Sequence, residues 1–258
     1  MSRWAGTLFA TLLAVFTCNA FGTADPDTGA VDAVRAVMNS PDRLAGDADA
    51  DARRKPDQVL AFFGIRPGMV VLEMFAGGGY YTELLSGLVG NDGAVVAQNN
   101  APYLQYTADE QALRFAPGRL PNVERLTAEN NELSLDEGRF DAAIFTLAYH
   151  DVYWVNEDIG WPAIDAPAML AEIFASLKPG AVVGVVDHVA AAGSGPESVQ
   201  ALHRIDPELL KADFEAAGFV FEAESDVLRN PADDHTLPMS AKEIRGKTDR
   251  FVYRFRRP

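Results

Sequence analysis

The sequence predicts an α/β fold in which a doubly wound, mostly parallel sheet of seven strands has helices on both faces and an N-terminal helical cap. Apolar segments rich in β-branched residues alternate with segments of helical periodicity, which is the pattern of βαβ units. Most of the apolar segments are nearly continuous, as in strands covered on both faces. The segments with strand character are residues 70–74, 94–97, 123–126, 142–146, 181–186, 219–223 and 250–255.

The clearest unit runs from Val70 to Thr82. It begins as a buried strand, has the carboxylate Glu73 near the strand's end, and turns through three glycines into a helix. Glycines let the backbone turn sharply and approach a ligand closely. In a doubly wound sheet, ligands bind beyond the carboxyl ends of the strands, so this turn predicts a ligand site.

Helical periodicity and stop signals place helices between the strands. The last strand segment alternates polar and apolar residues, which predicts that it lies at an edge of the sheet. Asp206 and Pro207 are typical of an N-cap followed by proline in the first helical turn. The predicted helices are residues 57–63, ended by Gly64; 82–89, ended by Gly90; 103–115, ended by Pro117 and Gly118; 167–177, stopped by Lys178-Pro179-Gly180; and 207–217, ended by Gly218.

The N-terminus predicts export. Arg3, a short apolar run and an Ala-rich end have the pattern of a secretory signal peptide over residues 1–24. Residues 25–56 are predicted to be a linker and cap, and residues 57–258 the α/β domain. The apolar run is short for a bilayer, so after cleavage we expect no stable membrane insertion and a periplasmic protein. A helix lying on the membrane is the alternative for this segment.

The net negative charge of the chain argues against one class of partner, the nucleic acids. The formal net charge is −15, with a sequence pI of about 4.6. This field repels phosphate backbones, so we expect no nucleic-acid partner. The single cysteine, Cys18, lies within the predicted signal peptide, which leaves the mature chain without thiols.

Polar side chains follow five of the predicted strands, more than a purely structural sheet requires. Two of these ends carry a histidine beside an aspartate, and we expect them to meet at one cleft. The hypothesis is that His150 or His188 acts as general base on an acceptor, oriented by Asp151 or Asp187. The polar strand ends are Glu73, Gln98-Asn99, Glu129-Asn130, Tyr149-His150-Asp151 and Asp187-His188.

The same histidines and aspartates are also the ligand types of zinc and similar ions. The chain contains no close ligand motif such as HExxH. The sequence by itself therefore favours a site without a metal, with metal binding as the lower-ranked alternative.

The stretch around the first strand resembles motif I of the class I S-adenosylmethionine (SAM)-dependent methyltransferases, in which an acidic residue and a glycine-rich loop hold the cofactor. The resemblance covers roughly residues 59–186 and implies that the chain is a methyltransferase with SAM as cofactor. On this mapping Gly77 and Gly79, with Gly78 between them, approach the methionine moiety. Glu73 fixes the loop or the amino group of the cofactor.

The resemblance also assigns residues to the nucleoside. Asn99 occupies the position of the acid that grips the ribose hydroxyls, and Glu129 that of the group contacting the adenine amino group. Phe75 stands where the first glycine of the motif is expected. A dinucleotide-binding interpretation is weaker, because it requires a third glycine near Thr82 and an acid after the second strand, and the sequence has neither.

The whole chain resembles a group of exported bacterial predicted methyltransferases, which implies methyl transfer to a small-molecule acceptor. Because SAM is made in the cytoplasm, two alternatives stay open. One is a periplasmic ligand-binding protein on a methyltransferase fold, and the other is a hydrolase or lyase that uses the His/Asp pairs. The resemblance rests on Gly79-Tyr80-Tyr81-Thr82, Arg54-Lys55-Pro56, Asp187-His188, His203-Arg204-Ile205-Asp206 and Thr248-Asp249-Arg250-Phe251.

Overall fold

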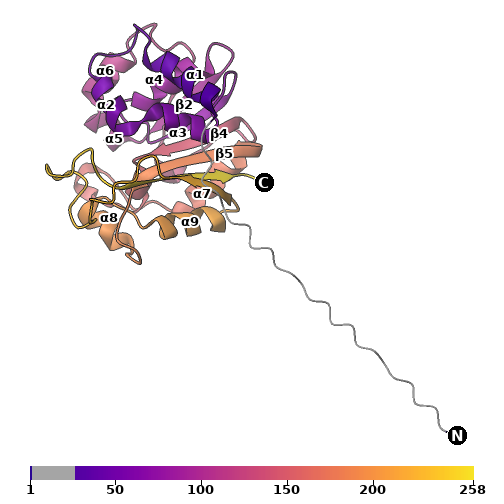
Figure 1. Cartoon of the computed structure of the whole chain (residues 1–258), viewed down its shortest axis with the longest axis vertical. Coiled ribbons are helices and arrows are strands. Elements are labelled where there is room, and N and C mark those ends of the chain that lie inside the picture. The colour runs from indigo at the N-terminus through magenta and orange to yellow at the C-terminus, as the bar shows by residue number, and fades with distance from the viewer. Residues whose placement is uncertain (2–26) are drawn as a thin grey trace.

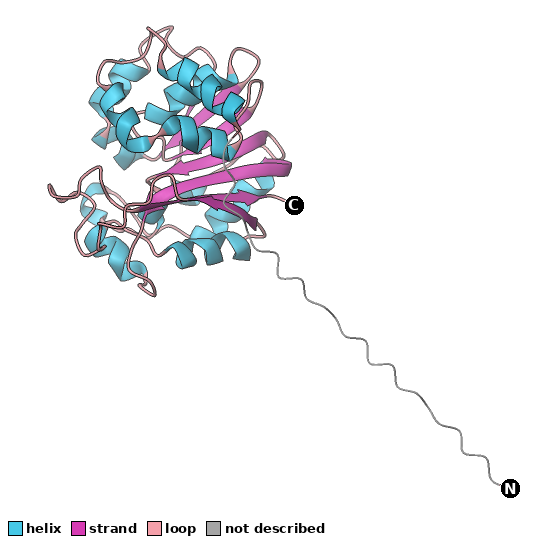
Figure 2. Cartoon of the chain, in the orientation of Figure 1, coloured by secondary structure: helices cyan, strands magenta, loops and turns pink. Residues whose placement is uncertain are grey.

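The computed structural model describes Met1 and residues 27–258, and the predicted signal peptide, apart from Met1, lies outside the described residues. A seven-stranded sheet runs through the centre with the order β3-β2-β1-β4-β5-β7-β6 (Figures 1 and 2). The strands are β1 (Val70–Met74), β2 (Ala94–Asn99), β3 (Val123–Thr127), β4 (Phe140–Thr146), β5 (Leu177–His188), β6 (Val220–Ser225) and β7 (Arg250–Arg256).

Strands β1 to β5 are parallel, and β7 is antiparallel to both of its neighbours. The chain adds strands outward from β1 to β3 and then returns to the other side of β1 with β4. This reversal between β1 and β4 is the point where a doubly wound sheet opens a crevice for ligands. The predicted fold class is therefore confirmed.

Helices cover both faces, with α1 to α6 on one side of the sheet and α7 to α9 on the other (Figure 1). No described helix is both long and apolar enough to span a bilayer. The helices are α1 (Thr28–Met38), α2 (Asp47–Arg54), α3 (Pro56–Phe63), α4 (Tyr80–Val89), α5 (Ala101–Tyr106), α6 (Ala108–Arg114), α7 (Ala166–Ser176), α8 (Pro196–Leu202) and α9 (Pro207–Ala216).

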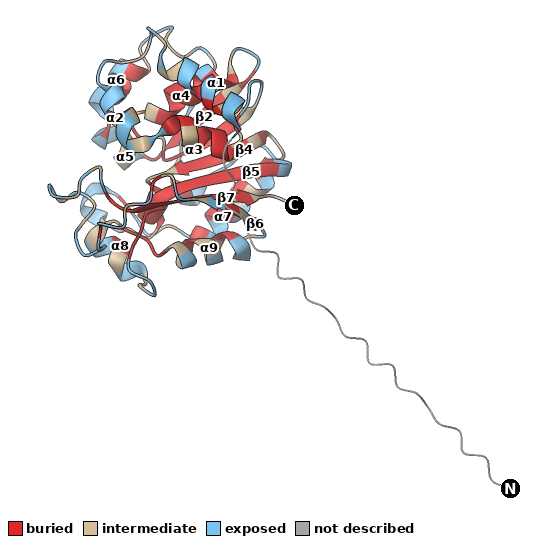
Figure 3. Ribbon diagram, viewed as in Figure 1, coloured by how far each residue is buried: buried red, intermediate tan, exposed pale blue. Residues whose placement is uncertain are grey.

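The core has two layers, one on each face of the sheet, and the inner strands between them are mostly buried (Figure 3). The edge strand β3 has no buried residue, and the edge strand β6 is buried only in part. Successive side chains of a strand point to opposite faces. Accordingly, Val71 packs in the layer under α3 and α4, whereas Leu72 packs in the layer above α7 and α9. Ile144 and Phe145 of β4 divide in the same way. Both faces are covered, which explains the nearly continuous apolar strands.

Strand β7 is not at the edge of the sheet, so that prediction is wrong. It lies between β5 and β6, and β6 forms the edge. The polar side chains that suggested an edge are engaged by protein: Arg254 and Arg256 both pair with Glu222 of β6, and they donate to the carbonyls of Phe62 and Gly180. Alternation in β7 therefore reflects ion pairs rather than contact with solvent.

The predicted helix over residues 103–115 is two helices, α5 and α6, separated at Thr107. The Thr107 hydroxyl donates to the carbonyl of Tyr103 at 2.7 Å, and the backbone there leaves the helical region (φ −108°, ψ 18°). A threonine that hydrogen-bonds back to its own helix bends or ends it. The break lets α6 turn onto the glycine turn that follows β1.

Candidate active site

The glycine turn after β1 has left-handed backbone at three positions, Phe75 (φ 51°), Gly77 (φ 58°) and Gly79 (φ 83°). Phe75 occupies the place of a motif glycine and keeps the backbone that a glycine would adopt. Its ring is buried, stacks on Trp161 at 6.1 Å between centroids, and meets Tyr103 edge-on at 5.9 Å. These aromatic contacts offset the conformational cost of a left-handed phenylalanine.

Two amides at the end of β2 hold this turn in place. The Gln98 side-chain oxygen accepts from the Phe75 N–H at 3.1 Å. Asn99 makes two bonds with Gly77: its oxygen accepts from the Gly77 N–H at 2.8 Å, and its NH₂ donates to the Gly77 carbonyl at 3.2 Å. At the position predicted to grip a ribose, Asn99 is thus engaged by the turn itself. A carboxylate there would have no proton to donate to the carbonyl.

Helices α5 and α6 pack directly on the turn, and this contact explains two of its three glycines. At Gly77 a methyl group would make an ordinary 3.6 Å contact with the Tyr103 ring, and it is the left-handed backbone (φ 58°) that favours glycine. On Gly78 a methyl group would come within 2.4 Å of the Glu110 carboxylate, and on Gly79 within 2.8 Å of the Phe115 ring. Only glycine leaves room for such a close approach.

A cavity of about 460 Å³ lies between the turn, α2, α5 and α6. Of the predicted cofactor residues, Glu73, Gly77 and Gly78 line it. Gly79, Asn99 and Glu129 do not, and the Glu129 carboxylate accepts from the Ala101 N–H at 3.0 Å, at the start of α5. Lining residues that sequence reasoning did not assign include Asp47, Arg54, Tyr103, Tyr106, Glu110 and Arg114.

Glu73 is the buried acid of this cavity, with 1% of its surface exposed. Burial raises the pKa of its carboxyl to about 8, against the opposing effects of a 2.5 Å hydrogen bond from Thr82 and the positive charges of Arg114 and Arg54. Near neutral pH the carboxyl is therefore largely protonated. A cationic ligand in the cavity would favour its ionised form.

His150 and Asp187 form a buried pair at the ends of β4 and β5. His150 lies in a short 3₁₀ turn, Tyr149–Val152, separated from the end of β4 by two residues. Its Nδ1 lies 2.7 Å from one oxygen of Asp187, and its backbone N–H donates to the other at 2.8 Å. Asp187 is fully buried, so this carboxylate fixes both the ring orientation and the tautomer of His150.

The pKa values of the two histidines predicted as bases are shifted in opposite directions. Burial acts to lower the pKa of His150, but the nearby Asp187 and Asp151 carboxylates outweigh it and raise the pKa to about 9. For His188, burial and the positive charges of His150, Arg250 and other nearby arginines hold the pKa well below its usual value. His188 Nδ1 lies 2.7 Å from the Thr248 hydroxyl, and its ring is 5.7 Å from that of His150.

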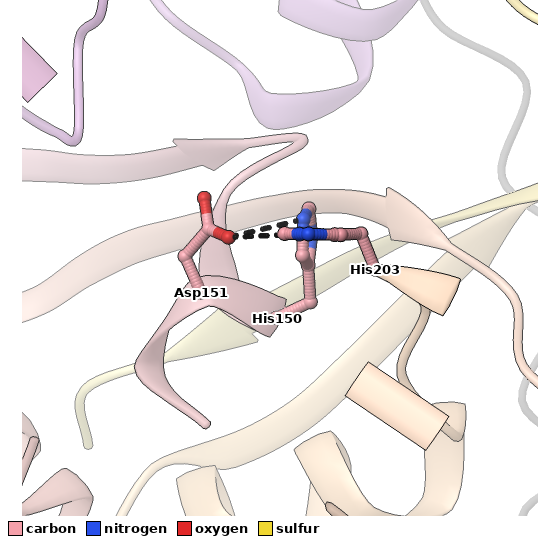
Figure 4. Close-up of side chains that lie close together, drawn as sticks. All are labelled: His150, Asp151 and His203. Atoms are coloured by element: carbon pink, nitrogen blue, oxygen red, sulfur yellow. Dashed lines mark ion pairs between the residues drawn. The ribbon is translucent and has the colours of Figure 1, made fainter. Parts of the chain in front are cut away.

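His203 completes the cluster, and sequence reasoning gave it no role. It follows α8 with left-handed backbone (φ 49°), and its Nδ1 stands 3.5 Å from Oδ1 of Asp151. His150 Nε2 stands 3.4 Å from the same oxygen (Figure 4). The only signal in the sequence is its position beside Arg204 and Asp206 in a family-like phrase, since 53 residues separate it from His150.

Tyr103 connects the cavity with this cluster. Its ring lines the cavity, and its hydroxyl donates to Oδ2 of Asp151 at 3.1 Å. Asp151 therefore receives Tyr103 on one oxygen and faces two histidines with the other. Trp161 adds a hydrogen bond from its indole N–H to the Asp151 carbonyl at 3.1 Å. The structure places all four predicted residues, His150, Asp151, Asp187 and His188, in one cluster, and it adds Tyr103 and His203. The catalytic roles assigned to the four stay predictions.

Comparison with known proteins identifies the fold. A family model described as protein-L-isoaspartate(D-aspartate) O-methyltransferase matches residues 32–152, a little under half of the chain. A SAM-dependent methyltransferase from Aquifex aeolicus is similar over 88% of this chain and 98% of its own, with 21% identity and a TM-score of 0.56. The fold is that of the class I methyltransferases.

Two further solved structures share this methyltransferase fold. An S-adenosylmethionine-dependent methyltransferase from Mesorhizobium loti covers 83% of this chain and 100% of its own at 16% identity, with a TM-score of 0.52. The [4+2]-cyclase SpnF covers 88% and 92% at 16% identity, with a TM-score of 0.56. No curated protein matches the chain. The family-model match and the fold together support the predicted enzyme class, a class I methyltransferase, and SAM as its cofactor.

The residues of the cavity fit SAM. The glycine turn offers backbone without side chains, and the walls combine carboxyl groups with tyrosine rings, which suit a sulfonium and an ammonium group. Glu73, Gly77 and Gly78 would hold the methionine part of the cofactor. When bound, SAM supplies an electrophilic methyl group on its sulfonium.

Proposed function

We propose that this protein transfers the methyl group of SAM to a small-molecule acceptor that binds beside His150, Asp151 and His203. The observation that carries the proposal is Tyr103, which lines the SAM cavity with its ring and holds Asp151 with its hydroxyl. The residues of the His/Asp cluster do not themselves line the cavity, so Tyr103 is the contact that supports treating cavity and cluster as one site. In-line positioning of the acceptor against the methyl group would provide most of the rate enhancement.

The surroundings of the cluster favour a small acceptor. His150 and Asp151 are 1% and 6% exposed, whereas His203 is part-exposed. The ring of Trp154 lies 5.0 Å from His203 and 5.5 Å from Trp161, so aromatic side chains border the approach. Aromatic walls with a few polar groups are typical of small-molecule sites.

Calorimetric titration with SAM and with S-adenosylhomocysteine tests cofactor binding. We expect one site per chain with micromolar affinity for at least one of the two. Absence of heat for either compound at high micromolar concentration would refute the methyltransferase function. Turnover is then measured as transfer of isotope-labelled methyl from SAM to a panel of small hydroxyl, thiol and amine acceptors. An isoaspartyl peptide belongs in the panel because of the family whose model matches residues 32–152.

One observation favours a second candidate. A [4+2]-cyclase shares the fold, so this architecture also carries chemistry other than methyl transfer. A ligand-binding protein, or a hydrolase or lyase using the His/Asp cluster, would bind a ligand in the cavity without consuming SAM. Conversion of a substrate in the absence of SAM, without methyl transfer to any acceptor, would favour the hydrolase or lyase. Binding of S-adenosylhomocysteine with neither reaction would favour the ligand-binding protein.

We further propose that the protein is exported to the periplasm, on the basis of the charged, apolar and Ala-rich order of residues 1–24. Export would place the enzyme apart from the cytoplasmic source of SAM, so a supply route would be required. Cell fractionation and sequencing of the mature N-terminus test this. A mature chain that starts at Met1 or Ser2 would contradict export.

A further inference from the structure

We propose that His150 Nε2, Asp151 Oδ1 and His203 Nδ1 form a three-ligand site for a divalent transition-metal ion of the zinc class. The sequence ranks metal binding low because no two of its histidines have the close spacing of a known motif. The structure changes that ranking, because it places His203 of the α8 end against the turn that follows β4 (Figure 4). Among the residues that the structure describes, these three form the group whose possible ligand atoms lie close enough together to hold a metal ion.

The distances fit an ion better than direct contact. The two nitrogens stand 3.4 Å and 3.5 Å from Asp151 Oδ1. Both distances are longer than the roughly 2.7–2.9 Å of a charge-assisted hydrogen bond between nitrogen and a carboxylate. All three ligand atoms lie within 4.8 Å of one another. In tetrahedral coordination with metal–ligand distances of about 2.0–2.1 Å, neighbouring ligand atoms are roughly 3.4 Å apart. The spacing around Asp151 is the one that a shared ion requires.

The outer contacts also match a metal site. A histidine that binds a metal almost always donates its other ring N–H to a carboxylate or carbonyl. His150 has this arrangement, because its Nδ1 lies 2.7 Å from the fully buried Asp187 and its Nε2 points to the cluster. Asp187 is held in turn by the backbone N–H groups of His150 and His188. Asp151 is oriented by the Tyr103 hydroxyl.

His203 pays a conformational cost at its position. A histidine with φ of 49° is uncommon outside turns, and such strain gathers at functional sites. Its ring is placed edge-on to that of His150, with centroids 5.6 Å apart, and packs on Trp154. In this conformation His203 Nδ1 stands 3.5 Å from Asp151 Oδ1.

Three protein ligands leave a fourth position, which is the pattern of catalytic rather than structural zinc sites. His203 is part-exposed, so the cluster meets solvent on the side of this residue. Resting on the proposed function, we infer that the fourth position takes an oxygen or sulfur donor of the acceptor. The ion would lower the pKa of that group and so favour the nucleophilic form. In this arrangement His150 is a ligand, and its Nε2 is not free to act as a base.

Titration of the untagged, chelator-treated full chain with Zn²⁺ or Co²⁺ tests the site. Calorimetry is expected to show one ion per chain, and Co²⁺ to give the strong visible absorption of tetrahedral coordination. His203→Asn keeps a residue that tolerates left-handed backbone and is expected to weaken Zn²⁺ binding by at least tenfold and to abolish the Co²⁺ spectrum.

His235→Asn is the matched control. His235 is also left-handed (φ 63°), part-exposed and close to an aspartate, with Nε2 3.1 Å from Asp249, but it lies outside the cluster. It is expected to bind Zn²⁺ like the unchanged protein. Thermal unfolding without metal verifies that both variants fold.

Binding below one tenth of an ion per chain for both metals, or equal Zn²⁺ affinity in His203→Asn and the unchanged protein, would overturn the metal site. These outcomes are independent of the proposed function, because metal titration needs neither SAM nor an acceptor. Conversely, a protein that binds Zn²⁺ through His203 but neither SAM nor S-adenosylhomocysteine would keep the metal site and lose the methyltransferase function.

Discussion

Two single residues give the glycine turn its shape, and both depart from the methyltransferase pattern. Phe75 holds left-handed backbone (φ 51°) without being glycine, at a cost of about 1–2 kcal/mol that its contacts with Trp161 and Tyr103 offset. Asn99 both donates to and accepts from Gly77. Asn99 satisfies the Gly77 carbonyl, which a carboxylate in its place could not do because it has no proton to donate.

Glu73 gives a prediction for pH. Its pKa is about 8 in the folded protein against an ordinary value of 4.5, so the folded state retains a proton that the unfolded state loses between these values. Stability is therefore expected to fall as pH rises from about 4.5 to about 8, by up to about 5 kcal/mol from this group. Glu73→Gln removes the ionisation and is expected to flatten the dependence.

Urea unfolding of both proteins at several pH values between 5 and 8.5 measures this effect. The difference between variant and unchanged protein isolates Glu73 from other titrating groups. If that difference were constant across the range, Glu73 would not have a raised pKa. Calorimetric titration with SAM in buffers of different ionisation enthalpy is a separate measurement. It is expected to show that SAM binding to the unchanged protein releases protons below pH 8, because a cationic ligand favours the carboxylate.

At the scale of elements, the break between α5 and α6 decides how the turn is covered. Thr107 ends α5, and α6 then brings Glu110 onto Gly78 while Phe115, which follows α6, packs on Gly79. The 3₁₀ turn after β4 and the end of α8 similarly bring His150 and His203 together from distant parts of the chain. The residues of the site are therefore positioned by helix ends and a short 3₁₀ turn rather than by the middles of long helices.

Gly78→Ala tests the packing of α6 on the turn. The added methyl would come within 2.4 Å of the Glu110 carboxylate and 2.7 Å of its Cβ, so α6 must move. We expect a loss of about 1–3 kcal/mol in stability and at least tenfold weaker SAM binding. Urea unfolding and calorimetry measure the two effects.

Gly29→Ala is the control, because its methyl would meet only the Asp27 carboxylate at 3.8 Å near the start of α1. It is expected to be neutral or to stabilise by up to about 1 kcal/mol. Equal SAM affinity in the Gly78 variant and the unchanged protein would show that α6 does not shape the cofactor site.

At the scale of the molecule, buried ion pairs tie the N-terminal helices to the sheet domain. Arg114 of α6 binds Asp47 of α2 at 2.7 Å and also pairs with Glu83 of α4. Arg43 adds a 2.9 Å pair with Asp47. Because Asp47 and Arg114 both line the cavity, the segment predicted as linker and cap forms part of its wall.

Arg114→Met is expected to cost about 2–4 kcal/mol in the free energy of unfolding, since it leaves two buried carboxylates short of a partner. Arg139→Met is the matched control, because Arg139 pairs with the exposed Glu124 at the surface and is expected to change stability by less than about 1 kcal/mol. Denaturant titration compares them. Equal losses in the two variants would mean that the Arg114 pairs do not anchor α2.

The sequence alone determined the strands, their parallel order of βα units and the position of the glycine turn, because apolar periodicity and glycine preferences are local properties. The inner position of β7 and the meeting of His203 with His150 were decided only by the tertiary structure. The partners of β7 come from β5 and β6, and His203 is 53 residues from His150, so neither leaves a local pattern. Contacts between distant segments depend on how whole elements pack, and packing is fixed by the fold rather than by spacing along the chain.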